Sequence, residues 1–125
     1  MISYDLDEAR KVLRLDLRKV RKADIAMTWT IDLVRRRPSL CQWDWIVDFR
    51  GAFDDDAEAS HLSRVAAAFT MPREPAWSLL ISLDPYLYLW AQAMDAQFPN
   101  RKHLVVTTRE EADLKLRQVR RAVIA

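Results

Sequence analysis

The chain has 125 residues, half of them apolar and 30% charged, a composition typical of one globular domain rather than a disordered chain. Its 20 Lys and Arg residues nearly balance 18 Asp and Glu, and a net charge of +2 argues against a nucleic-acid partner. One cysteine, Cys41, excludes an internal disulfide, and one glycine, Gly51, excludes the Gly-rich phosphate loops of common nucleotide-binding proteins.

These totals predict a single domain over residues 1–125. The N-terminal residues show neither a basic nor an apolar signal-peptide region, and the longest apolar run, near residues 86–94, is too short to span a bilayer. We therefore expect a cytoplasmic protein with no membrane span.

The first half of the chain predicts a β-hairpin, a helix and a strand. Apolar and polar residues alternate over residues 2–6 and 13–17, which is typical of two strands with one wet face. Residues 23–37 have helical periodicity, with Asp24 as the expected N-cap and Pro38 as the stop. Residues 41–49 alternate again and carry apolar residues on both faces, so we expect an interior strand.

The second half predicts alternating helices and strands. A helix is expected to begin with Asp55 and Glu58 at capping-box spacing, followed by a strand over residues 77–83. Asp84-Pro85 is typical of a helix start, residues 103–107 form the next expected strand, and Thr108 with Glu111 predicts a capped final helix. The whole order indicates an α/β fold with a mixed sheet, opened by the hairpin.

This order resembles the SpoIIAA-like group, which includes the STAS domains (anti-sigma-factor antagonists) and Sec14-type single-domain proteins. The residues that carry the resemblance are Ile2-Ser3-Tyr4-Asp5, Val12-Leu13-Arg14-Leu15, Ala23-Asp24 and Ile46-Val47-Asp48-Phe49-Arg50-Gly51. The resemblance implies a phosphorylatable serine after the central strand, but Arg50 stands at that place between Asp48 and Gly51. Arginine cannot accept the phosphate, so the switch is not expected here. Sec14-type relatives bind lipids in an apolar cavity.

The turn after the central strand is the predicted partner-binding site, with Asp48, Arg50, Gly51 and Asp54. Partners of α/β sheets tend to meet the carboxyl ends of strands, and the resemblance points to the same place. Arg50 is expected either to pair with Asp54, Asp55 or Asp56, or to project outward as a fork for a partner's carboxylate.

A second candidate surface is the aromatic run around Tyr86, Tyr88 and Trp90. Apolar residues occupy more than one face of this predicted helix. The pattern fits a dimer interface or ligand surface, and it fits equally well a helix buried on two sides.

Other chemical sites are not expected. The acidic residues 54–56 suit the first turn of a helix better than a metal ion, and two histidines with one cysteine give too few ligands for zinc. His61 lacks a triad arrangement, Cys41 is expected in the core, and the basic clusters are expected to be solvated. We expect no metal, no cofactor and no enzymatic activity.

The sequence therefore predicts a non-catalytic protein-interaction or regulatory module, with an unidentified protein partner and a possible homodimer. The alternative is a small-molecule or lipid-binding domain with an apolar pocket between sheet and helices. An exposed aromatic stripe over a solid core favours the first, and a large apolar cavity favours the second.

Overall fold

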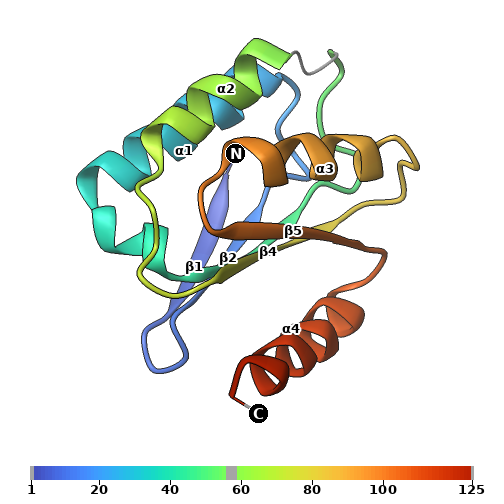
Figure 1. The fold of residues 1–125 in the computed structure, drawn as a ribbon. Helices are drawn as coiled ribbons and strands as arrows, with labels where there is room; N and C mark the ends of the chain where they lie inside the picture. The colour runs from blue at the N-terminus through green and yellow to red at the C-terminus, as the bar shows by residue number, and fades with distance from the viewer. Residues whose placement is uncertain (1, 56–58, 125) are drawn as a thin grey trace.

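The computed structural model of the chain describes residues 2–55 and 59–124. One mixed sheet lies between helices, with α1, α2 and α3 on one face and α4 on the other (Figure 1). In chain order the elements are β1 (Ser3–Asp7), β2 (Val12–Asp16), α1 (Ala23–Arg36), a 3₁₀ helix (Pro38–Gln42), β3 (Asp44–Asp48), α2 (Ala59–Ala68), β4 (Ala76–Ile81), α3 (Leu87–Gln97), β5 (Arg101–Val106) and α4 (Arg109–Ile124). The predicted α/β class with an N-terminal hairpin is confirmed.

The sheet has five strands in the order β1-β2-β3-β4-β5. The hairpin strands β1 and β2 are antiparallel, and β2, β3, β4 and β5 run parallel to one another. Helical crossovers are needed to connect parallel neighbours, which explains the alternation of helices and strands after the hairpin. Because β3 pairs with both β2 and β4, the expectation of an interior strand is confirmed.

The central strand is shorter than predicted. Cys41 and Gln42 belong to the 3₁₀ helix, and β3 begins only at Asp44. Pro38 has a fixed backbone angle that suits a first helical position, and Trp45 Nε1 donates a hydrogen bond of 2.9 Å to the carbonyl of Leu40. These two features favour a tight helical turn over extension of the strand. Cys41 is buried, as predicted.

The start of α1 corrects the predicted cap. Asp24 lies inside the first turn, and the residue at the N-cap, Lys22, makes no side-chain capping bond. Instead the backbone N–H of Ala23 donates a 3.0 Å hydrogen bond to Oδ1 of Asp55. A carboxylate from the loop before α2 thus supplies the negative charge that the helix N-terminus favours. Glu58, the other half of the capping box predicted for α2, lies outside the described residues.

Three smaller corrections concern element boundaries. The helix α3 begins at Leu87 rather than Pro85, because Asp84 accepts the N–H of Tyr86 at 2.9 Å in a preceding turn. The strand β4 ends at Ile81, and β5 begins at Arg101. At α4 the predicted cap is confirmed in part, since Thr108 Oγ1 accepts the N–H of Glu111 at 3.0 Å.

Each face of the sheet has its own apolar core. Leu13, Leu15, Trp45, Val47 and Leu80 pack in the cluster that includes residues of α1 and α3. The alternate residues of the same strands pack with α4 in a second cluster, formed by Val12, Ile46, Leu79, Ile81, Val106, Ala112 and Leu116. This division follows from the two-residue period of a strand.

Candidate functional site

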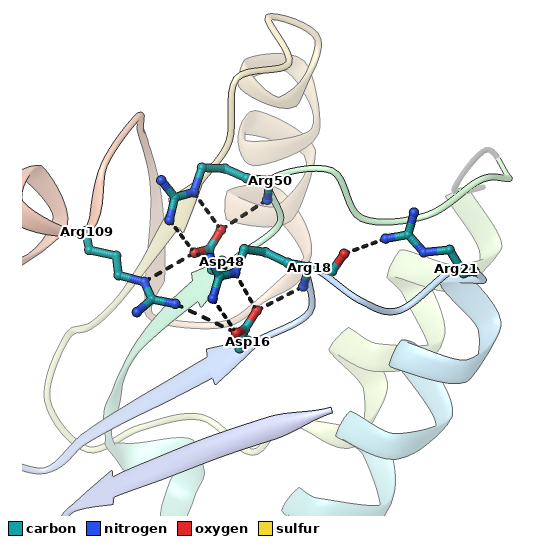
Figure 2. A network of polar contacts seen from close by, with 6 residues as sticks. All are labelled: Asp16, Arg18, Arg21, Asp48, Arg50 and Arg109. Atoms are coloured by element: carbon teal, nitrogen blue, oxygen red, sulfur yellow. Dashed lines mark hydrogen bonds and ion pairs between the residues drawn. The ribbon is translucent and has the colours of Figure 1, made fainter. Parts of the chain in front are cut away.

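Asp48 and Arg50, two residues of the predicted partner-binding turn, lie where two neighbouring parallel strands end. Asp16 and Asp48 are the last residues of β2 and β3 and are partners in the register of that pair. The Asp48 side chain is only 4% exposed, and Arg50 holds it in a fork, Nε to Oδ1 at 3.0 Å and Nη2 to Oδ2 at 2.7 Å (Figure 2). The backbone N–H of Arg50 donates to the same carboxylate at 3.1 Å.

Two further arginines complete this group, which we call the arginine–aspartate cluster (Asp16, Arg18, Asp48, Arg50 and Arg109). Arg18 forks onto Asp16 at 3.0 and 2.8 Å and lies 3.5 Å from Asp48. Arg109, the first residue of α4, lies 3.4 Å from Asp48 and 3.7 Å from Asp16. Figure 2 shows the three guanidinium groups arranged around the two carboxylates.

The arginines keep both carboxylates ionised. Hydrogen bonds from Arg18 lower the pKa of Asp16 to about 2 against the opposing effect of burial. At Asp48 burial acts to raise the pKa, but hydrogen bonds from Arg50 and the nearby Arg109 outweigh it, so the pKa lies below its usual value. The cluster is thus a set of internal ion pairs.

The structure brings only part of the predicted partner-binding site together. Asp48 and Arg50 are joined, but Asp54 lies 3.3 Å from Arg21 instead of Arg50. Asp55 caps α1, and Asp56 lies outside the described residues. The expectation that Arg50 pairs with these acids is therefore wrong for Asp54 and Asp55. Gly51 has a φ of 70°, which fits the predicted tight turn, and its carbonyl accepts Nη2 of Arg21 at 2.7 Å.

The aromatic run divides between two environments. Tyr86 and Tyr88 are 70% and 56% exposed, and the neighbouring Leu83 and Leu89 are exposed as well. Trp90 is half-buried and packs against the small apolar cluster of Leu62, Ala66 and Phe98. The run is therefore solvent-exposed at Tyr86 and Tyr88 and packed against the core at Trp90, and its use as an interface or ligand surface stays a prediction.

A cavity of about 540 Å³ lies between the sheet and the three helices α1, α2 and α3. Apolar side chains make up most of its wall: Leu15, Leu17, Met27, Trp45, Val47, Leu62, Val65, Leu80, Leu87, Trp90, Met94 and Phe98 are among them. This volume lies within the range of about 300–1,000 Å³ that is usual for small-molecule sites.

The two ends of the cavity differ. Gly51, which follows β3, and Leu83 and Asp84, which follow β4, line the end at the carboxyl edge of the sheet, and all three are exposed. Arg101 and His103, from the first half of β5, line the other end and are 3% and 6% exposed. We therefore call the exposed end at the carboxyl edge the open end and the buried end at the amino edge the closed end.

Polar groups gather at the closed end. Arg101 donates from Nη1 to Ser78 Oγ at 2.9 Å and from Nη2 to the carbonyl of Trp43 at 2.7 Å. His103 Nδ1 lies 3.0 Å from Oδ1 of Asp95. Burial lowers the pKa of His103 to about 4 despite Asp95, so the ring is neutral at pH 7.

Sequence reasoning did not single out Arg101. The sequence offers one signal, which is that Arg101 is a basic residue close to a predicted buried strand. The predicted strand covers residues 103–107 and therefore leaves out Arg101, whereas β5 begins at that residue. His61, expected at the edge of a buried stripe, is half-buried and lines the cavity.

Within residues 2–55 and 59–124, no group of three or more His, Cys, Asp or Glu side chains is placed to hold a metal ion. Of the helices in the same part of the chain, none combines the length and the apolar character needed to cross a membrane.

Comparison with known proteins gives no match: no family model fits the chain, and neither the curated proteins nor the solved structures include one that is similar to it.

Proposed function

We propose that this protein binds a small apolar or amphipathic molecule in the cavity between the sheet and α1, α2 and α3. The observation that carries the proposal is the cavity itself, with a volume of about 540 Å³, a largely apolar wall and one open end. A pocket of this volume with an apolar wall has the size and the lining that are usual for a small-molecule site.

The position of the open end supports the same proposal. In α/β sheets, ligands bind outside the carboxyl ends of the strands, and Gly51 and Asp84 place the opening there. The side chains that converge on the closed end, Ser78, Arg101 and His103, give the apolar site the few polar groups that fix a ligand's orientation.

The resemblance to STAS and Sec14-type domains stays a proposal about family, supported by the order of hairpin, helices and parallel strands.

The test is a titration with decanol, an uncharged apolar probe, followed by calorimetry or tryptophan fluorescence. Ala26, on α1 in the cavity wall, is replaced by phenylalanine to fill the space, and Ala67→Phe on the exposed side of α2 is the matched control. Saturable binding should be retained in Ala67→Phe and lost in Ala26→Phe, with both variants folded by circular dichroism. Equal binding by both variants would place the probe outside the cavity and contradict the proposal.

A second candidate function, an interaction module, is favoured by a separate observation. Leu83, Tyr86, Tyr88 and Leu89 are each more than half exposed at the start of α3. Clustered exposed apolar side chains are typical of a surface that another molecule covers, and self-association is the commonest form in soluble proteins. The arginine–aspartate cluster supports this candidate less, because the Arg50 fork is already occupied by Asp48.

A further inference from the structure

Arg101 is a buried cation at the closed end of the cavity. Its terminal nitrogens donate four hydrogen bonds, to the carbonyls of Trp77, Cys41 and Trp43 and to the hydroxyl of Ser78, at 2.7–3.2 Å. None of these acceptors carries a formal charge. The hydrogen-bonding needs of the guanidinium are largely met, but its positive charge is not neutralised.

No carboxylate in the described part of the chain forms an ion pair with Arg101. Asp44 is the acid that acts on it most, but Asp44 accepts Nε of Arg120 at 2.8 Å and the N–H of Trp77 at 2.8 Å. Burial lowers the pKa of Arg101 to about 10, so the group stays charged at neutral pH. Buried charges in proteins are normally paired, because an uncompensated one is strongly disfavoured.

The groups beside Arg101 can receive an anion. Arginine has five N–H donors, and Nε–H donates to no acceptor among the described residues. The Ser78 oxygen accepts from Arg101, so its own hydroxyl hydrogen can be donated. His103 is neutral and its Nδ1 hydrogen faces Asp95, so its Nε2 is an acceptor, and the donors available to an anion are those of Arg101 and Ser78.

The open end has the opposite charge. Asp55 and Asp84 both line the cavity there and are exposed. An anionic group is therefore disfavoured at the opening and favoured at the closed end, while the apolar wall between the two ends suits a hydrocarbon or aromatic body.

We propose that the ligand is an apolar monocarboxylate that enters carboxylate first and places its charged group beside Arg101 and Ser78. This inference rests on the proposed function and adds the chemical class and the orientation of the ligand. The carboxylate supplies the negative charge that the buried guanidinium lacks. A charge-assisted hydrogen bond of this kind favours the acid over the matching alcohol by about tenfold or more.

The test compares decanoate, decanol and decylamine on the unmodified protein, each below its aggregation concentration. We expect decanoate to bind at least about tenfold more tightly than decanol, and decylamine to bind least. Bound decanoate should also raise the pKa of His103 from about 4, read from its imidazole proton signals, because a nearby anion stabilises the charged ring. Decanol carries no charge and should not raise the pKa of His103.

The variant Arg101→Gln, with the exposed Arg64→Gln as its control, should lose the preference for decanoate and keep decanol binding. If Arg101→Gln does not fold, the comparison of the three probes and the His103 signal decide the matter. Equal affinity for decanoate and decanol, a preference for decylamine, or an unchanged His103 pKa would overturn the inference and leave the proposed function standing. Absence of binding by all three probes would overturn the proposed function itself.

Discussion

Asp48 is the residue on which the arginine–aspartate cluster depends. Its nearly buried carboxylate contacts Arg18, Arg50 and Arg109, so Asp48→Asn removes the negative charge that these three guanidinium groups share. We expect this variant to lower the free energy of unfolding by about 2–3 kcal/mol, measured by urea denaturation. The exposed Asp54, which lies 3.3 Å from Arg21 and outside the cluster, is the control, and Asp54→Asn should cost less than about 1 kcal/mol. Equal losses would show that the cluster does not stabilise the fold.

His103 should make stability depend on pH. Its pKa is about 4 in the folded protein against 6.5 for a free histidine, so the unfolded chain binds a proton at a higher pH than the folded chain does. The stability it contributes is complete above pH 6.5 and is lost as the pH falls toward 4. Denaturation at several pH values should show this loss, and His103→Gln should reduce it. If the free energy of unfolding depended on pH equally in both proteins, a neutral buried His103 would be ruled out.

The residues of the arginine–aspartate cluster and Arg101 differ in how far the sequence can predict their contacts. Asp48 and Arg50 are two residues apart at a strand end, so their proximity follows from local structure. Arg18 and Arg109 reach the same carboxylate from other elements, and no local pattern predicts that meeting. Arg101 was missed for the same reason, because its acceptors at Cys41 and Trp43 lie about 60 residues earlier.

At the scale of elements, periodicity predicted most helices and strands, since buried faces impose it directly on the sequence. The β3 strand was recognised as interior from its two apolar faces, for example Trp45 on one and Ile46 on the other. Capping was less predictable. Asp24 is of a residue type that often caps helices, but it lies within the first turn. The distant Asp55 supplies the carboxylate instead, because the loop before α2 brings it to the N–H of Ala23.

This cap gives a prediction for α1. Asp55→Ala should lower the free energy of unfolding by about 1 kcal/mol, since it removes the partner of an N-terminal N–H group and a charge that complements the helix dipole. Asp24→Ala, which removes an exposed carboxylate 3.7 Å from Arg64, should have a smaller effect. Thermal and urea unfolding of the two variants provide the measurement, and a larger loss for Asp24→Ala would mean that Asp55 is not the effective cap.

At the scale of the whole molecule, the exposed residues of α3 predict self-association. Light scattering at high micromolar concentration should give the mass of a dimer, because symmetric pairing of Tyr86, Tyr88 and Leu89 would remove apolar surface from water. Tyr88→Glu should restore the monomer, whereas Tyr4→Glu, on the exposed edge strand β1, should not. A monomer mass for the unmodified protein would contradict the interaction-module candidate.

The sequence predicts an apolar pocket between sheet and helices only as part of an alternative function. Apolar residues on the inner faces of β3, β4 and α1 fit a solid core and a hollow one equally well. Whether a space remains depends on how closely three helices approach one sheet, which is a property of packing over many distant residues. In the structure a pocket of about 540 Å³, open at one end, lies between those layers.

The most direct test of ligand binding in this cavity is a methyl NMR titration of protein labelled at methionine. Met27 and Met94 line the cavity, and Met71 is 65% exposed outside it. Addition of decanoate or decanol should shift the Met27 and Met94 signals in a saturable way and leave Met71 in place. Shifts confined to Met71, or no saturable shift at Met27 and Met94 with either probe, would contradict the account.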